Sequence, residues 1–148
     1  MILSDFKVFP KSGRLIGIDW GARRTGVAVS DDLHNFVFVR PVVVVKNPTE
    51  LINKIVDLIK SERAVGVVVG LPLRTDGTES ETTDMVRLFA KELSCVIDLP
   101  IVFIDETLSS SSAQAEMGRV SVRDIKEKLD SESARVILEN AISVIHRN

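Results

Sequence analysis

The stretch at residues 16–26 reads IGIDWGARRTG and places a carboxylate, Asp19, at the end of an apolar run. Residues 15–18 are typical of a strand covered on both faces, where an isolated charge is unfavourable. Gly21 then interrupts the pattern and residues 25–30 form a second short apolar run, so this segment predicts two paired strands. In an open α/β sheet, chemistry usually takes place beyond the carboxyl ends of the strands. Asp19 is therefore a candidate functional residue.

The composition is that of a globular chain. Its 148 residues are 45% hydrophobic and 27% charged, which predicts a single domain, residues 1–148, burying roughly 70% of its unfolded surface. Apolar runs such as residues 65–71 are far shorter than the roughly 20 residues of a membrane span. Residues 1–14 lack the apolar centre of a secretory signal, so we expect a cytoplasmic protein without a membrane partner. The only cysteine, Cys95, lies among apolar residues and is expected to pack rather than react.

The remaining periodicity predicts a mixed sheet of five strands flanked by helices. Three further segments rich in β-branched residues are expected as strands: residues 36–45, 64–69 and 101–104. Four segments are expected as helices: one that begins at Asn47 and Pro48, then residues 85–93, 109–117 and 130–147. Short turns join antiparallel strands and helical crossovers join parallel ones, so a three-strand meander precedes two parallel strands. Pro41 belongs at a bulge or an edge, and the fold class is α/β.

Two more carboxylates are expected at the edge of the sheet where Asp19 lies. Asp105 and Glu106 directly follow the predicted strand at residues 101–104. If that strand runs parallel to the strand of Asp19, the acids of both strands meet at one edge. Taken alone, Asp19 could instead anchor the turn that follows it, and Glu106 could pair with an arginine.

The last helix supplies a third acid. Asp130 lies four residues before Ala134 and seven before Ile137, so it extends the apolar stripe of this helix by one turn. Asp130 is therefore expected to face the sheet. Its alternative role is to cap the helix by accepting a hydrogen bond from a backbone amide.

A cluster of three ionised acids needs a cation or must hold protons, because each unit of upward pKa shift costs about 1.4 kcal/mol. Mg²⁺ or Mn²⁺ prefers oxygen ligands and retains waters, which suits a site built from carboxylates. His34 and His146 lie outside these motifs, so zinc is not expected. Two such ions about 4 Å apart can activate water and stabilise the leaving oxygen of a phosphoryl displacement. The predicted substrate is a phosphodiester.

Four motifs in this order resemble the YqgF family, described as Holliday-junction resolvases and as pre-16S ribosomal RNA nucleases with an RNase H-like fold. The motifs are IGIDWGARRTGVAVSD from residue 16, VVVGLPLRTDGTES from 67, IDETLSS from 104 and DSESARVILENAI from 130. The likeness spans residues 14–145. The first motif alone also resembles the phosphate loop of sugar kinases and actin-like ATPases. By resemblance, Asp19, Glu106 and Asp130 are the catalytic acids and hold Mg²⁺ or Mn²⁺.

Five side chains are candidate contacts to the substrate: Arg23, Arg24, Arg74, Thr107 and Arg119. The first two sit in the turn after the first strand and are expected to position phosphates, with simple solvent exposure as the alternative. Thr107 stands where members of the resembled family usually carry an arginine, so a hydroxyl replaces a charge. Arg74 or Arg119 is the hypothesised replacement for that charge.

These observations predict a metal-dependent nuclease that cleaves structured RNA, with 5′-end maturation of 16S rRNA implied by the resemblance. A Holliday-junction resolvase would use the same chemistry but needs two active sites on one substrate. A sugar kinase or ATPase resembles two fused copies of such a domain, which argues against it at this length. A non-catalytic RNA-binding protein would hold a structural ion only, and the net charge of −2 gives no sign of a polyanionic partner. The sequence leaves open RNA against DNA and monomer against homodimer.

Overall fold

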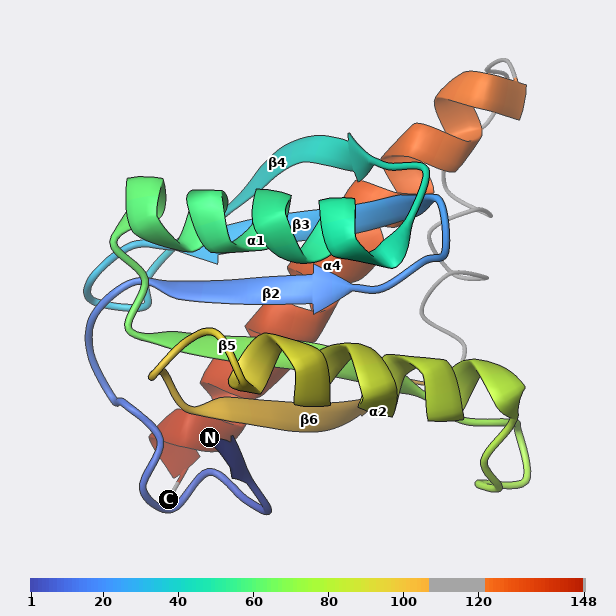
Figure 1. Cartoon of the computed structure of the whole chain (residues 1–148). Helices are drawn as coiled ribbons and strands as arrows, with labels where there is room; N and C mark the ends of the chain where they lie inside the picture. The colour runs from blue at the N-terminus through green and yellow to red at the C-terminus, as the bar shows by residue number, and fades with distance from the viewer. Residues whose placement is uncertain (107–121, 148) are drawn as a thin grey trace.

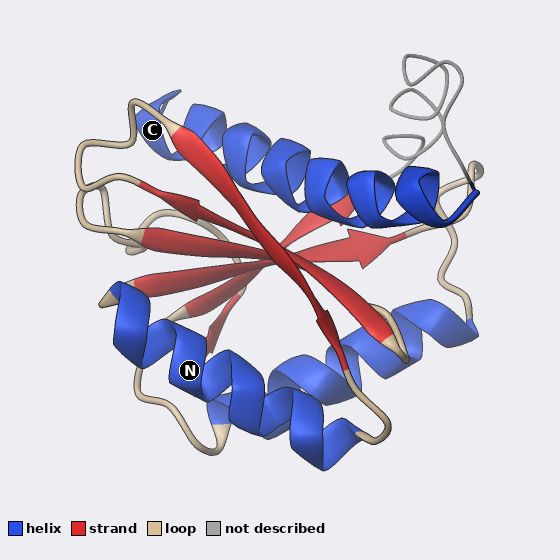
Figure 2. Ribbon diagram, turned by 90° about the horizontal axis from the view of Figure 1, so that it is seen from above, coloured by secondary structure: helices blue, strands red, loops and turns tan. Residues whose placement is uncertain are grey.

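Helices cover both faces of a twisted sheet in the computed structural model, which describes residues 1–106 and 122–147, with side chains of the last helix described from residue 132 (Figure 1). Seen from above, two helices lie on one face of the sheet and one long helix crosses the other (Figure 2). The pair is α1, Pro48–Glu62, and α2, Glu81–Ser94, and the crossing helix is α4, Val122–Arg147. This is the layered α/β arrangement predicted from the sequence.

The described sheet has six strands in the order β1-β6-β5-β2-β3-β4. Their bounds are β1 Ile2–Leu3, β2 Leu15–Asp19, β3 Arg24–Ser30, β4 Val37–Val44, β5 Gly66–Pro72 and β6 Ile101–Glu106. Strands β2, β3 and β4 form the antiparallel meander. Strands β5 and β6 run parallel to β2, as expected for strands joined through helices. The predicted mixed topology is confirmed.

The predicted count of five strands is wrong by one. The sixth strand, β1, contributes the pairs Ile2↔Ile101 and Leu3↔Val102 to the edge of the sheet beside β6. The Ile101 amide also donates to the Met1 carbonyl at 2.8 Å. A strand of two residues has no periodicity to detect, so only its pairing with a distant strand defines it.

Pro41 lies where its chemistry requires. β4 is an edge strand, and its pairing with β3 shifts between Val27↔Arg40 and Thr25↔Val43, which leaves one extra residue on β4. Pro41 therefore sits within a bulge at an edge, where a missing backbone donor interrupts no ladder.

The helix ends follow the expected capping chemistry for α1 and differ from expectation for α4. Asn47 caps α1, its side chain accepting from the Glu50 amide at 2.8 Å. The last helix begins at Val122, eight residues before the predicted start, so Asp130 lies inside α4 and is not its cap. The helix expected at residues 109–117 lies outside the described residues. Among the residues described, no helix combines the length and apolar character needed to cross a bilayer.

The expectation that Cys95 packs among apolar residues is wrong. This cysteine is exposed rather than packed, because it follows the last residue of α2 as its C-cap. Leu93, two residues earlier, takes the buried position on that helix and is fully shielded from solvent.

The core is divided between the two faces of the sheet. The core between the sheet and the helices α1 and α2 contains Ile16, Ile18, Val67 and Val69 of the strands and Val86 and Phe89 of α2. Leu15 and Val68 pack toward α4, whose described stripe is Ala134, Ile137, Leu138, Ala141 and Ile145. Alternate residues of each strand therefore serve opposite faces, as a period of two requires.

Candidate active site

Strands β2, β5 and β6 end at one edge of the sheet, which we call the carboxyl edge, and two of them end in an acid. Asp19 is the last residue of β2 and Glu106 is the last residue of β6. Both strands run parallel to β5, which lies between them. The predicted meeting of Asp19 and Glu106 at one edge is therefore what the topology produces.

Both acids lie on the face of the sheet that α4 covers. A Cβ added to Gly17 would come within 2.8 Å of Leu138 Cβ and 3.0 Å of the Ala134 carbonyl oxygen, so Gly17 faces α4. Asp19, two residues further along β2, lies on the same face. Glu106 follows Ile104, which packs in the α4-side core, and is on that face as well.

Asp105 takes the opposite face and is separated from this pair. It lines a hollow with Arg87 and Phe103, on the side of α2, and the Arg87 guanidinium carbon lies 5.5 Å from the centre of the Phe103 ring. Of the two acids that end β6, only Glu106 shares a face with Asp19.

Gly70 leaves space for the Glu106 carboxylate above the sheet. A Cβ added to Gly70 would come within 2.8 Å of Glu106 Oε2 and 3.0 Å of Ile137 Cγ1. Gly70 follows Val69, the β5 partner of Ile18, so it lies roughly 4.8 Å across the sheet from Asp19. The Glu106 side chain thus extends back from its strand end toward Asp19. The strand predicted at residues 64–69 stops one residue before Gly70, whereas β5 continues to Pro72. A glycine within the apolar run VVVGLP was the available signal for a close approach at this position.

The third expected acid, Asp130, is placed by its backbone alone, because its side chain lies outside the described set. It precedes Ala134 by one turn, or about 6 Å along the axis of α4. The beginning of α4 lies on the side of the molecule where β2 ends (Figure 1). The backbone of α4 therefore runs from Ala134, beside Gly17, back to Asp130 in the direction of the carboxyl edge.

The candidate phosphate ligands occupy different positions around the carboxyl edge. Arg23 is exposed in the turn between β2 and β3, and Arg24, half-buried, begins β3 opposite Val44. Arg74 is exposed in the loop after β5. Thr107 and Arg119 lie outside the described residues.

The loop that carries Arg74 is held by its own hydrogen bonds. The Arg74 amide donates to the Thr78 carbonyl at 2.9 Å, and the Gly77 amide donates to the Arg74 carbonyl at 2.8 Å. Asp76 accepts from the Thr78 hydroxyl at 2.6 Å and from its amide at 3.0 Å. These bonds, the hydroxyl first, lower the pKa of Asp76 below its usual value. Residues 74–78 therefore form a tight loop.

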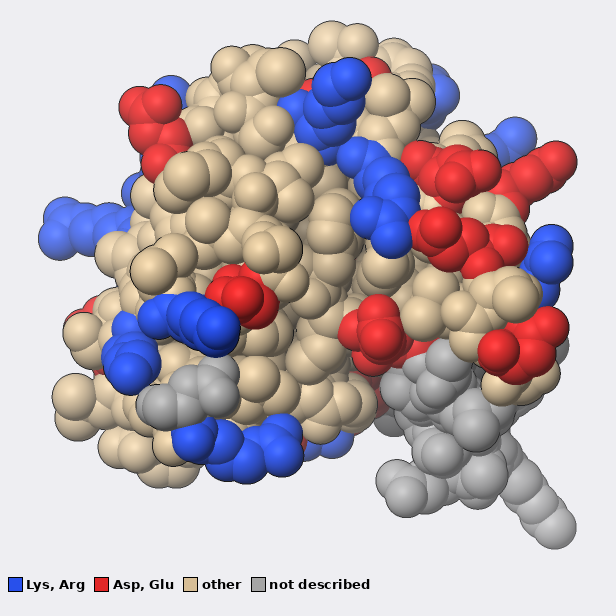
Figure 3. All heavy atoms as spheres, turned by 90° about the horizontal axis from the view of Figure 1, so that it is seen from below, with Lys and Arg blue, Asp and Glu red and all other residues tan. Residues whose placement is uncertain are grey.

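Acidic side chains surround the carboxyl edge more widely. The segment from the loop after β5 into the start of α2 carries exposed Asp76, Glu79, Glu81 and Asp84. Acidic side chains gather on the right-hand side of the surface in Figure 3, the side on which β2 ends in Figure 1. The resulting negative potential attracts cations and repels phosphates, so nucleic acid needs cationic partners to approach here.

The chemistry of this site fits a hard divalent ion and not zinc. Asp19 and Glu106 offer carboxylate oxygens on one face, and the missing side chain of Gly70 lets the Glu106 carboxylate lie close to the sheet there. The two histidines contact each other instead, His34 Nδ1 to His146 Nε2 at 3.0 Å, and His34 Nε2 contacts the Gly13 carbonyl at the far end of β2. Among the described residues no group of three or more potential metal ligands occurs; the third acid expected from sequence, Asp130, is not in that set.

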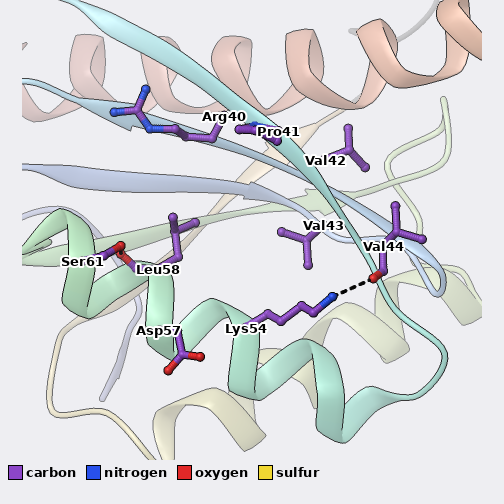
Figure 4. Close-up of a pocket in the computed structure, with 9 residues that line it drawn as sticks. All are labelled: Arg40, Pro41, Val42, Val43, Val44, Lys54, Asp57, Leu58 and Ser61. Atoms are coloured by element: carbon purple, nitrogen blue, oxygen red, sulfur yellow. Dashed lines mark hydrogen bonds between the residues drawn. The ribbon is translucent and has the colours of Figure 1, made fainter.

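Another groove lies between the edge strand β4 and α1 (Figure 4). It has a volume of about 460 Å³ and is lined largely by aliphatic side chains of β4 and by Lys54, Asp57 and Leu58 of α1. Lys54 Nζ donates to the Val44 carbonyl at 3.1 Å and pairs with Glu50 at 3.4 Å. Neither Asp19 nor Glu106 lines this groove, so we assign it no part in the chemistry.

Comparison with known sequences gives a consistent result. A profile of the family described as "RuvX: Holliday junction resolvase" matches residues 13–144. A protein of Maridesulfovibrio salexigens named "Putative pre-16S rRNA nuclease" is 38% identical over 128 residues, 85% of this chain and 95% of the relative. A protein of Rickettsia canadensis with the same name is 30% identical over 144 residues, 96% of this chain and 94% of the relative.

Solved structures show the same fold at low sequence identity. The RuvC protein of T. thermophilus, in complex with a Holliday junction substrate, aligns with a TM-score of 0.57 and 14% identity, covering 91% of this chain and 96% of its own. The yeast mitochondrial Holliday junction resolvase Ydc2 aligns with a TM-score of 0.52 and 11% identity, covering 95% and 81%. At these identities the likeness establishes an RNase H-like fold and nothing about substrate.

Proposed function

This chain belongs to the RuvX family, and from that premise we propose that it is a metal-dependent nuclease of the cytoplasm that cleaves structured RNA. RuvX is the YqgF family that four sequence motifs indicated, and that inference is thereby confirmed. Pre-16S rRNA is the substrate we favour, because relatives that share 30% to 38% identity over most of the chain carry that name.

One observation carries the proposal: Asp19 and Glu106 share a face and an edge, with the Glu106 carboxylate extended over Gly70 toward Asp19. Carboxylates on the same face and at the same edge repel each other, and a divalent cation bound by both offsets that repulsion. A structural role for either acid alone would not require both on the face covered by α4.

In the proposed reaction Asp19, Glu106 and Asp130 hold Mg²⁺ or Mn²⁺. When bound, the metal supplies a water of lowered pKa and charge stabilisation for the leaving oxygen. Arg23 and Arg24 hold the substrate phosphates at the edge, where they also offset the surrounding acids. Arg74, Thr107 and Arg119 are proposed as further substrate contacts.

The test is cleavage of a labelled 16S rRNA precursor with Mn²⁺ or Mg²⁺ and with EDTA. We expect metal-dependent cleavage by the parent protein. The cleavage rate should fall by more than roughly 100-fold, the loss typical of residues that contact a metal ligand rather than the metal, in each of Asp19→Asn, Glu106→Gln and Asp130→Asn. Asp105→Asn is the matched control, because it neutralises the neighbouring acid on the opposite face and keeps the parent rate. Equal loss in Asp105→Asn and Glu106→Gln would contradict the assignment of the site to one face.

A Holliday-junction resolvase is the second candidate, favoured by the description of the matching family. It predicts paired cuts in a four-way DNA junction by the same residues, with the RNA precursor left intact. A non-catalytic RNA-binding protein predicts binding of the precursor without cleavage at any metal concentration, and binding unaffected by Asp130→Asn.

A further inference from the structure

A cavity of about 210 Å³ opens beside Asp19 on the opposite face of the sheet. Its walls come from the turn after β2, from the start of α1 and from α2. The side chains that matter here are Trp20, Lys46, Leu51, Met85, Leu88 and Phe89. We propose that this cavity binds one unstacked nucleobase of the substrate strand, next to the phosphate that is cleaved. The inference rests on the proposed nuclease function and adds a subsite to it.

The position of Trp20 links this cavity to the acids. Trp20 follows Asp19 directly, and alternation along the chain sends the two side chains to opposite faces: Asp19 toward α4, Trp20 against the core beneath α1 and α2. A nucleic-acid strand with its phosphate at Asp19 therefore crosses the carboxyl edge beside the cavity. A base splayed out of its stack at that point can enter it.

The walls of the cavity are apolar and partly open to water. Leu51 and Phe89 form buried surface, with exposures of 2% and 4%, whereas Met85 and Leu88 are 49% and 55% exposed. Two large, exposed apolar side chains beside a partly buried tryptophan form an apolar surface, and its burial under a ligand is favourable. A nucleobase presents a flat π-face to such a surface, and stacking on an aromatic side chain contributes about 1–3 kcal/mol per base.

Size favours a base over a peptide helix. The cavity is smaller than the roughly 300–1,000 Å³ of pockets that bury drug-sized ligands, which suits a single planar ring system. Its lining carries one cation and one anion, exposed Lys46 and exposed Glu92, and Lys46 offers its charge to the phosphate of the bound nucleotide. The groove in Figure 4 lacks this combination, because it has no aromatic wall and its Lys54 already contacts Val44 and Glu50.

The chain provides its own reporter for this cavity. Trp20 is the only tryptophan and the chain has no tyrosine, so intrinsic emission reports on Trp20 alone. The intact protein is titrated in EDTA with a short single-stranded oligoribonucleotide, and with an abasic oligomer of the same length and charge. We expect saturable quenching by the base-containing strand and, with the abasic strand, no quenching and about tenfold weaker binding. Equal responses to the two strands would overturn the proposal.

Two matched pairs of variants locate the effect. Leu88→Ala weakens binding of the base-containing strand about fivefold, whereas Leu33→Ala, an equally apolar change at a 71% exposed site before β4, does not. Lys46→Ala weakens binding at low salt, whereas Lys60→Ala at the other end of α1 has little effect. Circular dichroism confirms that each variant is folded. Equal loss in a variant and its control contradicts the assignment to this cavity.

Failure of the subsite and failure of the nuclease proposal give different results. Metal-dependent cleavage by the parent, with equal quenching by both strands, overturns the subsite alone. Base-specific quenching by a protein that cleaves no RNA or DNA supports the subsite and overturns the nuclease. Quenching by Asp19→Asn equal to that of the parent supports a base site that is separate from the acids.

Discussion

At the scale of single residues, Gly70 controls where the Glu106 carboxylate can lie. Its missing side chain leaves the space that Glu106 Oε2 and Ile137 occupy above β5. The nearest atom to a Cβ at this position is Ile137 Cδ1, in a side chain that is 2% exposed, and the next is Glu106 Oε2 at 2.8 Å. A Cβ here would therefore displace both the Ile137 side chain and the Glu106 carboxylate.

Gly70→Ala therefore tests the geometry of the acids. We expect it to lower the free energy of unfolding by roughly 1–3 kcal/mol through overpacking. Cleavage should fall by up to about 100-fold, because a displacement of about 1 Å at a catalytic group has that effect. Urea denaturation and the RNA cleavage assay measure the two quantities.

Gly66→Ala is the control, since it overpacks the same face of the same strand against Phe9 Cζ at 2.7 Å and Leu15 Cδ2 at 3.1 Å. It should destabilise the protein to a similar degree and leave cleavage by the folded fraction unchanged. Parallel loss of cleavage in both variants would show that overpacking of β5, and not the position of Glu106, affects the rate.

At the scale of secondary-structure elements, Glu62 joins three of them on the side away from the acids. It is the last residue of α1 and accepts from Arg40 of β4 at 2.7 Å and from Arg14, just before β2, at 2.5 Å. The hydrogen bond from Arg40 is the largest influence that holds the pKa of Glu62 below its ordinary value of 4.5. The side chains of Glu62, Arg14 and Arg40 are only partly exposed, so solvent screens their two ion pairs less than it screens a surface ion pair.

Glu62→Gln is expected to lower the free energy of unfolding at about pH 7 by roughly 1–3 kcal/mol. Because the folded protein depresses the pKa of this carboxyl, its contribution is present above the unfolded pKa of about 4.5. The contribution is lost as the pH falls through the lower, folded pKa. Urea denaturation at several pH values from about 7 to about 3 should therefore show the parent and Glu62→Gln converging in acid.

Glu79→Gln removes a carboxylate that pairs with Arg87 at 2.6 Å, but both side chains of that pair are about half exposed. It should change stability by less than about 0.5 kcal/mol at any pH. A Glu62 variant no more affected than this control would show that the contact among α1, β2 and β4 contributes little.

At the scale of the whole molecule, one copy presents one carboxyl edge with Asp19 and Glu106. Cleavage of a linear RNA needs one such edge, whereas resolution of a four-way junction needs two on the same substrate. The number of copies engaged therefore separates the two candidate substrates.

We expect the cleavage rate of the linear precursor to rise in proportion to protein concentration, as for a single acting copy. Light scattering coupled to size exclusion, with precursor or junction added, measures the copies bound. Two copies on a junction, with symmetric cuts and no cleavage of the precursor, would contradict the RNA assignment and favour the resolvase.

Much of the fold followed from local pattern, because each signal lay within a few residues. The apolar run before Asp19 and the β-branched run at residues 101–104, just before Asp105 and Glu106, located β2 and β6. Asn47 and Pro48 located the start of α1 correctly. The start of α4 was missed by eight residues, although Val122, Ile125 and Leu129 recur at helical spacing and were the available signal.

The sequence by itself determined the strand ends that carry Asp19 and Glu106, the apolar stripe of α4 and, through four ordered motifs, the family. Only the tertiary structure decided that Glu106 extends over Gly70 while Asp105 turns to the other face, and that Trp20 opens a cavity with Met85 and Leu88. The reason is physical: periodicity is a local property of the chain. Strand register and the close approach of α4 arise from contacts between residues far apart in sequence.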